Sequence, residues 1–221
     1  MPPTLRLVPF DPATAPAGER RERLVALLRD MENVHPCPLV STRTRLVFGA
    51  GNANADLMFV GEAPGASEDR AGLPFVGRAG KFLDTLLEEV GLARSDTFIT
   101  NVLKCRPPGN RDPHPDEIDA CRPYLYDQVT LIRPRVICTL GNFATKLLTG
   151  RPEGITKVHG RPQEREVGGV PVRLYPIFHP AAALRTPAVA ELTREDFRRL
   201  PALLAHRPDG PGAAGSELPR A

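Results

Sequence analysis

Apolar and polar positions along the chain divide it into two kinds of segment. Four short runs are apolar almost throughout, which is typical of strands buried on both faces of a sheet: residues 56–60, 97–100, 136–140 and 172–178. Apolar residues recur at helical spacing in four other segments: residues 82–90, 116–132, 142–148 and 192–204. Because strands separated by helices are joined by crossovers, the pattern predicts a parallel sheet with helices on both faces.

This alternation predicts one α/β/α domain, which we place at residues 19–206 of the 221-residue chain. The composition, with 41% hydrophobic and 25% charged residues, excludes a fibrous or wholly disordered protein. Residues 1–18 and 207–221 lack a periodic pattern and are rich in proline or glycine, so we expect disordered tails there.

Charge, apolar runs and cysteines exclude further classes. No apolar run approaches the roughly 18 residues that span a bilayer, and the first residues do not resemble a secretory signal, so we expect a soluble cytoplasmic protein. A net charge of +3 is too small to indicate a nucleic-acid partner by itself. Four cysteines are too few for a disulfide scaffold and read as reduced thiols or metal ligands.

Three polar residues follow predicted strands, and ligands of open parallel sheets bind at the carboxyl ends of strands. Glu62 follows the first strand, Asn101 the second and His179 the fourth, so these side chains should converge on one cleft. Each also has an ordinary interpretation: a solvated loop glutamate, a turn-forming asparagine and a structural histidine. Their shared position favours a functional site.

The loop at residues 61–69 could alternatively cradle phosphate, because its glycines expose backbone amides. It lacks the P-loop pattern, and residues 77–82 lack the spacing and the hydroxyl for Mg²⁺, so the sequence argues against a nucleoside triphosphate site. The dinucleotide fingerprint fails as well. The loop at residues 101–111 carries three cations and no acid: Lys104, Arg106 and Arg111. Such a loop suits a phosphodiester backbone, although a solvated surface loop would look the same.

Four segments together resemble the iron–sulfur uracil-DNA glycosylases of family 4. They are Gly-Glu-Ala-Pro-Gly at 61–65, Pro-Phe-Val-Gly-Arg-Ala-Gly at 74–80, Thr-Asn-Val-Leu-Lys-Cys-Arg-Pro-Pro-Gly-Asn-Arg at 100–111, and His-Pro at 179–180. The resemblance covers roughly residues 31–204. It implies a three-layer α/β/α sandwich with a central four-stranded parallel sheet, and a monomeric enzyme that hydrolyses the N-glycosidic bond of deoxyuridine in DNA, starting base excision repair.

The resemblance also implies roles at the site, because a base in a duplex must be flipped out before it can be cleaved. Phe75 would stack on the uracil, and Asn101 would read its edge. His179 and the backbone amide of Ala63 would stabilise the uracil anion. Glu62 and Glu68 would stabilise the sugar cation or orient the water. The sequence leaves open which glutamate has which role.

The same resemblance implies a DNA-binding surface next to the site. Leu184 would fill the gap left by the flipped base, while Arg185 would hold a phosphate. The cations of the basic loop would hold further phosphates: Lys104, Arg106 and Arg111.

The cysteines follow the family in part. Cys37, Cys105 and Cys121 match three ligands of a [4Fe–4S] cluster, but Val34 occupies the position of the fourth. We take His35 as the alternative fourth ligand; three thiolates and an imidazole would equally suit zinc. Cys138 lies inside an apolar strand and is interpreted as a core thiol.

Two rival functions use the same fold. A related group cross-links itself to the abasic product and carries an inserted Arg-rich loop, where this chain has Pro-Pro-Gly at 107–109. The other rival is a non-catalytic DNA-binding protein, which would be favoured if the glutamates or His179 pointed away from the cleft.

Overall fold

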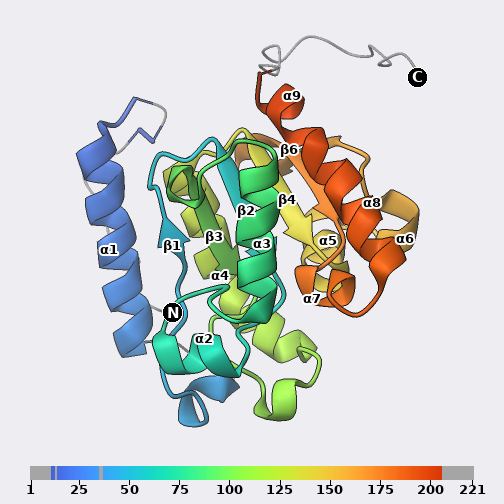
Figure 1. Ribbon diagram of the computed structural model, residues 1–221. Coiled ribbons are helices and arrows are strands. Elements are labelled where there is room, and N and C mark those ends of the chain that lie inside the picture. The colour runs from blue at the N-terminus through green and yellow to red at the C-terminus, as the bar shows by residue number, and fades with distance from the viewer. Residues whose placement is uncertain (1–10, 13, 35–36, 206–221) are drawn as a thin grey trace.

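The structure is a computed structural model that describes residues 11–12, 14–34 and 37–205 (Figure 1). Its centre is a six-stranded sheet in the order β1-β3-β2-β4-β6-β5. The four inner strands run parallel to one another: β3 (Thr97–Asn101), β2 (Leu57–Gly61), β4 (Val136–Leu140) and β6 (Val170–Ile177). Two edge strands run antiparallel to their neighbours: β1 (Ala50–Gly51) and β5 (Gln163–Val167). The α/β class is confirmed, and the sheet is wider and more mixed than predicted.

Helices lie between successive inner strands along the chain. The α-helices are α1 (Ala17–Val34), α2 (Ala66–Ala71), α3 (Arg78–Glu89), α4 (Pro115–Ile132), α5 (Asn142–Thr149), α6 (Ile155–Val158), α7 (Pro180–Ala183), α8 (Pro187–Arg198) and α9 (Leu200–Ala205). Short 3-10 turns are η1 (Pro38–Ser41), η2 (Arg94–Asp96) and η3 (Pro108–Asn110). The helix predicted over 192–204 is two helices, and α1 begins inside the segment predicted as a disordered tail. The remainder of both predicted tails lies largely outside the described residues.

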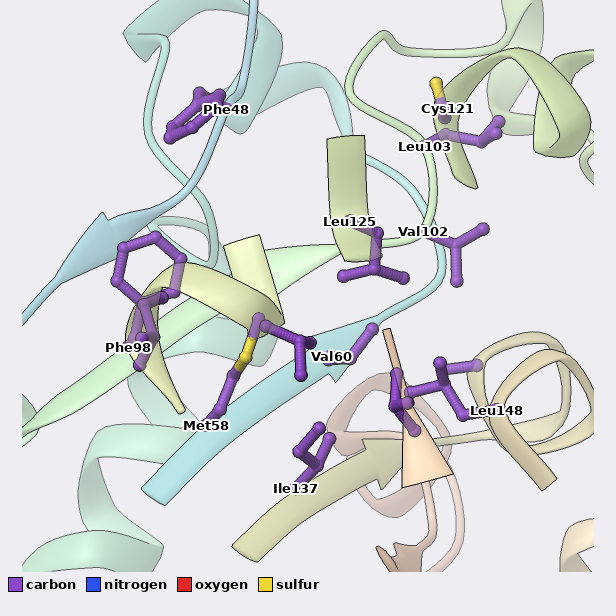
Figure 2. Packing of buried hydrophobic residues seen from close by; sticks show 14 of the residues in the cluster. Phe48, Met58, Val60, Phe98, Val102, Leu103, Cys121, Leu125, Ile137 and Leu148 are labelled. Atoms are coloured by element: carbon purple, nitrogen blue, oxygen red, sulfur yellow. The ribbon is translucent and has the colours of Figure 1, made fainter. Parts of the chain in front are cut away.

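The strands bury both of their faces, as continuous apolar runs require. Met58 and Val60 belong to one core cluster, which includes residues of α1, α4 and α5 (Figure 2). Leu57 and Phe59 belong to the opposite cluster, which includes residues of α3, α8 and α9. Cys138 lies in this second cluster, so it is a core thiol. Among the described residues, none of the helices is long and apolar enough to cross a membrane.

Candidate active site

A cleft of about 350 Å³ opens at the carboxyl ends of β2, β3 and β6. Its volume falls within the range of small-molecule sites. The sequence-predicted residues that line it are Glu62, Ala63, Glu68, Phe75, Asn101, Arg111, His179 and Arg185. The parallel topology therefore brings together segments that are more than a hundred residues apart in the chain.

Asn101 presents an unpaired polar atom to this cleft. The residue is 1% exposed, and its Oδ1 atom has no hydrogen-bond partner within the described chain. A buried acceptor without a donor is costly unless a ligand supplies one. Gly61 makes room for it: a Cβ atom there would lie 2.3 Å from Asn101 Oδ1 and 2.8 Å from the Phe75 ring. Gly61 opens the first motif of the family resemblance, but its close approach to Asn101 was not predicted, although a glycine at a strand end is a signal of such an approach.

Replacing Gly61 with alanine should therefore abolish most of the activity of this cleft while the protein still folds. The new methyl group would displace either the Asn101 amide or the Phe75 ring from the floor of the cleft. Single-turnover cleavage and thermal melting would measure the two effects. Gly18→Ala, in α1, is a suitable control, because a Cβ at Gly18 would meet no atom within 4 Å and Gly18 has no positive φ. Equal activities of the two variants would contradict the prediction.

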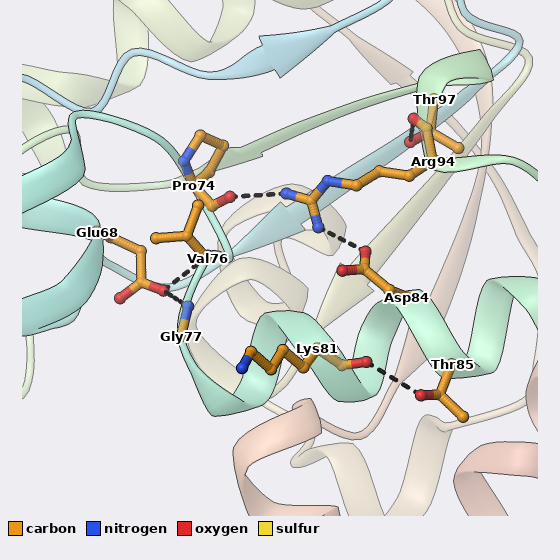
Figure 3. Close-up of polar contacts among 9 residues, drawn as sticks. All are labelled: Glu68, Pro74, Val76, Gly77, Lys81, Asp84, Thr85, Arg94 and Thr97. Carbon is orange, nitrogen blue, oxygen red and sulfur yellow. Dashed lines mark hydrogen bonds and ion pairs between the residues drawn. The ribbon is translucent and has the colours of Figure 1, made fainter.

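The loop that carries Phe75 is held in a strained conformation. Phe75 has a φ of 52°, a left-handed value that is rare for a bulky residue. Glu68 Oε1 accepts hydrogen bonds from the backbone amides of Val76 at 3.0 Å and Gly77 at 2.8 Å (Figure 3). Arg94 donates to the carbonyl of Pro74 at 2.8 Å. These bonds stabilise a conformation that the loop would not keep alone.

A glycine in α3 completes this arrangement. A Cβ atom at Gly80 would lie 1.8 Å from the Phe75 carbonyl oxygen, so only glycine permits the helix to approach the loop so closely. The Phe75 ring lies 5.7 Å from the His179 ring, centroid to centroid, at an angle of 31°. The ring is thus fixed beside the histidine with one side on the cleft.

His179 precedes α7 and has a defined proton arrangement. Its Nδ1 atom accepts a hydrogen bond from the Ala181 amide at 3.1 Å. Burial, with a smaller contribution from the charge of Arg185, lowers the pKa of His179 to about 4, although Glu68 opposes the shift. The neutral ring therefore carries its proton on Nε2, which makes Nε2 a hydrogen-bond donor.

Two further groups at the cleft can take part in a reaction: a carboxylate and a backbone amide. Burial raises the pKa of Glu62 above its ordinary value of 4.5, and the negative charge of Asp112 raises it further. A carboxylate with a raised pKa is a stronger base. In the described part of the chain, the backbone amide of Ala63 has no acceptor, so it is free to donate to a ligand.

The structure corrects one of the predicted DNA contacts, that of Lys104. This side chain is 0% exposed, so it cannot reach a phosphate. Arg111 lines the cleft, but its guanidinium pairs with the buried carboxylate of Glu117, which offsets its charge. Arg106 lies outside the set that lines the cleft and donates to Asn110 at 2.7 Å.

The predicted intercalation residues lie on the surface beside the cleft. Leu184, at the end of α7, is 41% exposed. Arg185 is exposed and donates to the Ala181 carbonyl at 3.2 Å. An exposed leucine next to an exposed cation is compatible with contact to a nucleic acid.

The three candidate thiol ligands come together inside the protein, away from the cleft. Cys37 hydrogen-bonds with both Cys105 and Cys121, and all three are buried. These hydrogen bonds and burial raise the pKa of Cys105 and of Cys121 far above the ordinary range. Without a metal, both thiols are therefore protonated. Arg43 donates to Cys105 Sγ at 3.5 Å and would offset thiolate charge.

This donor set suits a soft metal but is incomplete. Across the residues described, no group of three or more His, Cys, Asp or Glu side chains has an arrangement that would hold a metal ion. Three neighbouring thiols nevertheless provide the ligand chemistry of an iron–sulfur cluster or zinc. His35, the predicted fourth ligand, lies outside the described residues.

Comparison with known proteins identifies the class to which this fold and cleft belong. Residues 48–202 match the sequence model of the Uracil DNA glycosylase superfamily, and this range contains every residue that lines the cleft. The chain is a member of that superfamily.

Individual relatives narrow the assignment. A type-4 uracil-DNA glycosylase of Saccharolobus solfataricus is 44% identical over 192 residues, 85% of this chain and 89% of the relative. That of Archaeoglobus fulgidus is 44% identical over 81% of this chain and 92% of the relative. That of Thermotoga maritima is 45% identical over 75% and 85%. The chain belongs to the type-4 uracil-DNA glycosylase family.

Proposed function

We propose that this uracil-DNA glycosylase binds a flipped deoxyuridine in the cleft and reads the uracil edge with Asn101. The unpaired Oδ1 atom of Asn101 is the observation that supports this role. It would accept the N3–H of uracil, while the Asn101 Nδ2 donates to the uracil O4 atom. Cytosine has an acceptor at N3 and a donor at its amino group, so both contacts would be mismatched. Phe75 would stack against the ring of the base.

Cleavage breaks the bond between C1′ of the sugar and N1 of uracil. Both electrons of the bond go to uracil, which leaves as an anion, and the sugar becomes an oxocarbenium-like cation. The Nε2–H of His179 and the amide of Ala63 would donate to the uracil O2 atom, where negative charge develops. Glu62 would orient a water for attack on C1′ and accept its proton, giving an abasic site.

The two glutamates have different roles in this proposal. Glu68 already uses Oε1 to accept from two amides of the Phe75 loop, so we assign it to positioning the stacking ring. Glu62 has a raised pKa and no such backbone contacts in the described chain, so we assign it to the water. The sequence alone left this order open.

The surface next to the cleft would hold the DNA. Leu184 would fill the gap in the base stack, and Arg185 and Arg106 would contact phosphates. We propose that the enzyme acts as a monomer. Size-exclusion chromatography with light scattering would measure the mass.

The function is tested with DNA oligonucleotides, single- and double-stranded, that carry one uracil. We expect abasic product from both, with strand cleavage only after heat or alkali, because the cleft provides no described amine to attack the sugar. Nicked DNA without that treatment would contradict simple hydrolysis. A protein–DNA adduct that survives denaturation would indicate the cross-linking alternative, and unchanged DNA would indicate a binding protein without catalysis.

The rate of cleavage should fall at acidic pH as Glu62 becomes protonated. Only the carboxylate accepts a proton, so kcat/KM should decrease as pH falls through the raised pKa of Glu62. His179, with a pKa of about 4, remains neutral over most of that range. Asp112→Asn removes a charge that raises the pKa of Glu62, so the decrease should move to lower pH. An unmoved profile would contradict the assignment.

We also propose that the three thiols hold a metal centre, a [4Fe–4S] cluster with His35 as fourth ligand or, alternatively, zinc. The role would be structural, because the centre ties η1 to the segment after β3 and to α4. The thiols lie apart from the cleft-lining residues.

Anaerobically purified protein should contain about four irons and four sulfides per chain, with visible absorption. Cys105→Ala should lose the metal, because it removes one of the three thiols. Cys138→Ala should keep it, since Cys138 lies in the opposite core cluster. Loss of metal in His35→Ala would support that ligand, whereas one zinc and no visible absorption would indicate the alternative centre. Metal retention in Cys105→Ala would contradict the site.

A further inference from the structure

Lys104 is a fully buried lysine whose role the mechanism has not used, and burial lowers its pKa to about 7. Its Nζ atom donates hydrogen bonds to the Asn101 carbonyl at 2.8 Å and to Gln128 Oε1 at 2.7 Å. The third acceptor is the hydroxyl of Thr100. A buried ammonium is costly unless each of its protons has a partner, and here each proton has one.

The direction of these bonds is set by the neighbouring carbonyl of Phe48. That oxygen accepts from the Thr100 hydroxyl at 2.8 Å and from Gln128 Nε2 at 2.9 Å. The hydroxyl proton of Thr100 is therefore engaged, and the amide of Gln128 turns its oxygen toward Lys104. Lys104 must then donate all three bonds, and the network joins β3, α4 and the segment before β1.

The bond to Asn101 acts where the sheet ends. Asn101 is the last residue of β3. Beyond it the backbone pairs with the end of β2 and the residue after it: the Val102 amide donates to the backbone carbonyl of Gly61 at 2.9 Å, and the Leu103 amide donates to the backbone carbonyl of Glu62 at 3.0 Å. The carbonyl of Asn101 points instead to the ammonium of Lys104. The bond thus holds the backbone of the residue whose side chain lines the cleft.

An apolar residue of similar volume would avoid the cost of burying a charge, and buried ionic groups are often no more stabilising than such replacements. Stability alone therefore does not explain Lys104. We propose that Lys104 is a positioning residue for uracil recognition, which holds the backbone of Asn101 so that its side-chain amide faces the uracil edge. This inference rests on the proposed role of Asn101, and Lys104 itself touches neither base nor phosphate.

The test is a double-mutant cycle with Lys104→Met and Asn101→Ala, measured as single-turnover rates on uracil DNA. Lys104→Met keeps the length of the side chain and removes its three hydrogen bonds. We expect a 10- to 100-fold lower cleavage rate, a similar rise in the inhibition constant of free uracil, and unchanged KM for DNA. In the Asn101→Ala background the same change should have less than a twofold further effect. Lys146→Met, the same change at an exposed lysine of α5, is the control.

Two results would overturn the proposal: no loss of rate in Lys104→Met, or an equal loss in both backgrounds, which would indicate general destabilisation. If Lys104→Met does not fold, Gln128→Met removes one acceptor of the same ammonium from α4, together with a 3.3 Å contact from the Thr100 hydroxyl, and leaves the bond from Lys104 to Asn101 in place. Its smaller loss must likewise disappear in the Asn101→Ala background. A wild-type protein that cannot excise uracil would refute the proposed function instead, independently of Lys104.

Discussion

Replacing Asn101 with aspartate should lower the single-turnover rate of uracil excision about a thousandfold or more. The substitution exchanges the Nδ2 donor for an acceptor that faces the uracil O4 atom, and sites built on hydrogen bonds reject mismatched partners strongly. It also places a charge on a side chain that is 1% exposed, close to a departing anion. DNA with uracil and DNA with cytosine would be assayed in parallel. We expect the ratio of the two rates to fall, because a donor at cytosine N4 suits the new acceptor.

Asn110→Asp is a matched control for this change. Asn110 also lines the cleft, and its Oδ1 atom accepts from Arg106, a contact that aspartate can keep. The same charge is thereby added without altering the group that reads the base, so the selectivity between uracil and cytosine should remain. A comparable loss of selectivity in both variants would show that charge alone is responsible and would remove the recognition role of Asn101.

Replacing His179 with alanine should lower the cleavage rate by roughly 10²- to 10³-fold, the usual effect of removing one donor from a site that stabilises an anion. The affinity for uracil-containing DNA should change much less, since the donor acts mainly on charge that develops as the bond breaks. Rapid-quench kinetics and binding to a non-cleavable substrate analogue would separate the two quantities.

His179→Gln tests whether the donor is what matters. Glutamine supplies an N–H group in place of Nε2, so it should recover part of the rate that alanine loses. His179 also accepts a hydrogen bond from the Ala181 amide at the start of α7, so its replacement can weaken the fold there. Melting temperatures would identify any loss of rate that is due to misfolding. Equal rates for the alanine and glutamine variants would mean that the ring, and not its proton, supports catalysis.

The sequence predicted the convergence of Glu62, Asn101 and His179, because position at a strand end is a local property that parallel topology converts into proximity. It could not predict the burial of Lys104. One of the acceptors that satisfy this lysine is Gln128, 24 residues further along the chain on another element. A count of charges in the loop at 101–111 cannot detect such a partner.

The sequence pattern did not predict three other elements, β5, β1 and α1. The strands β5 and β6 are joined by Gly168 and Gly169, a two-glycine turn that is a good hairpin signal, but the polar alternation of β5 does not resemble a buried strand. The two-residue strand β1 is too short to produce any period. In α1, buried Leu24 and Met31 are seven residues apart, about two helical turns, but the helix follows directly on a proline-rich segment without a periodic pattern.

The loop that carries Phe75 is held by hydrogen bonds with Glu68 and Arg94, and this affects the order of events during repair. The stacking ring, its strained backbone and the carboxylate that holds it are in place before any DNA binds, so the protein has little conformational entropy to lose at that moment. We therefore expect the slow structural step to lie in the DNA, which must unstack and unpair the damaged nucleotide. On this account, weakly paired and unpaired uracil should be excised faster than uracil in a stable pair.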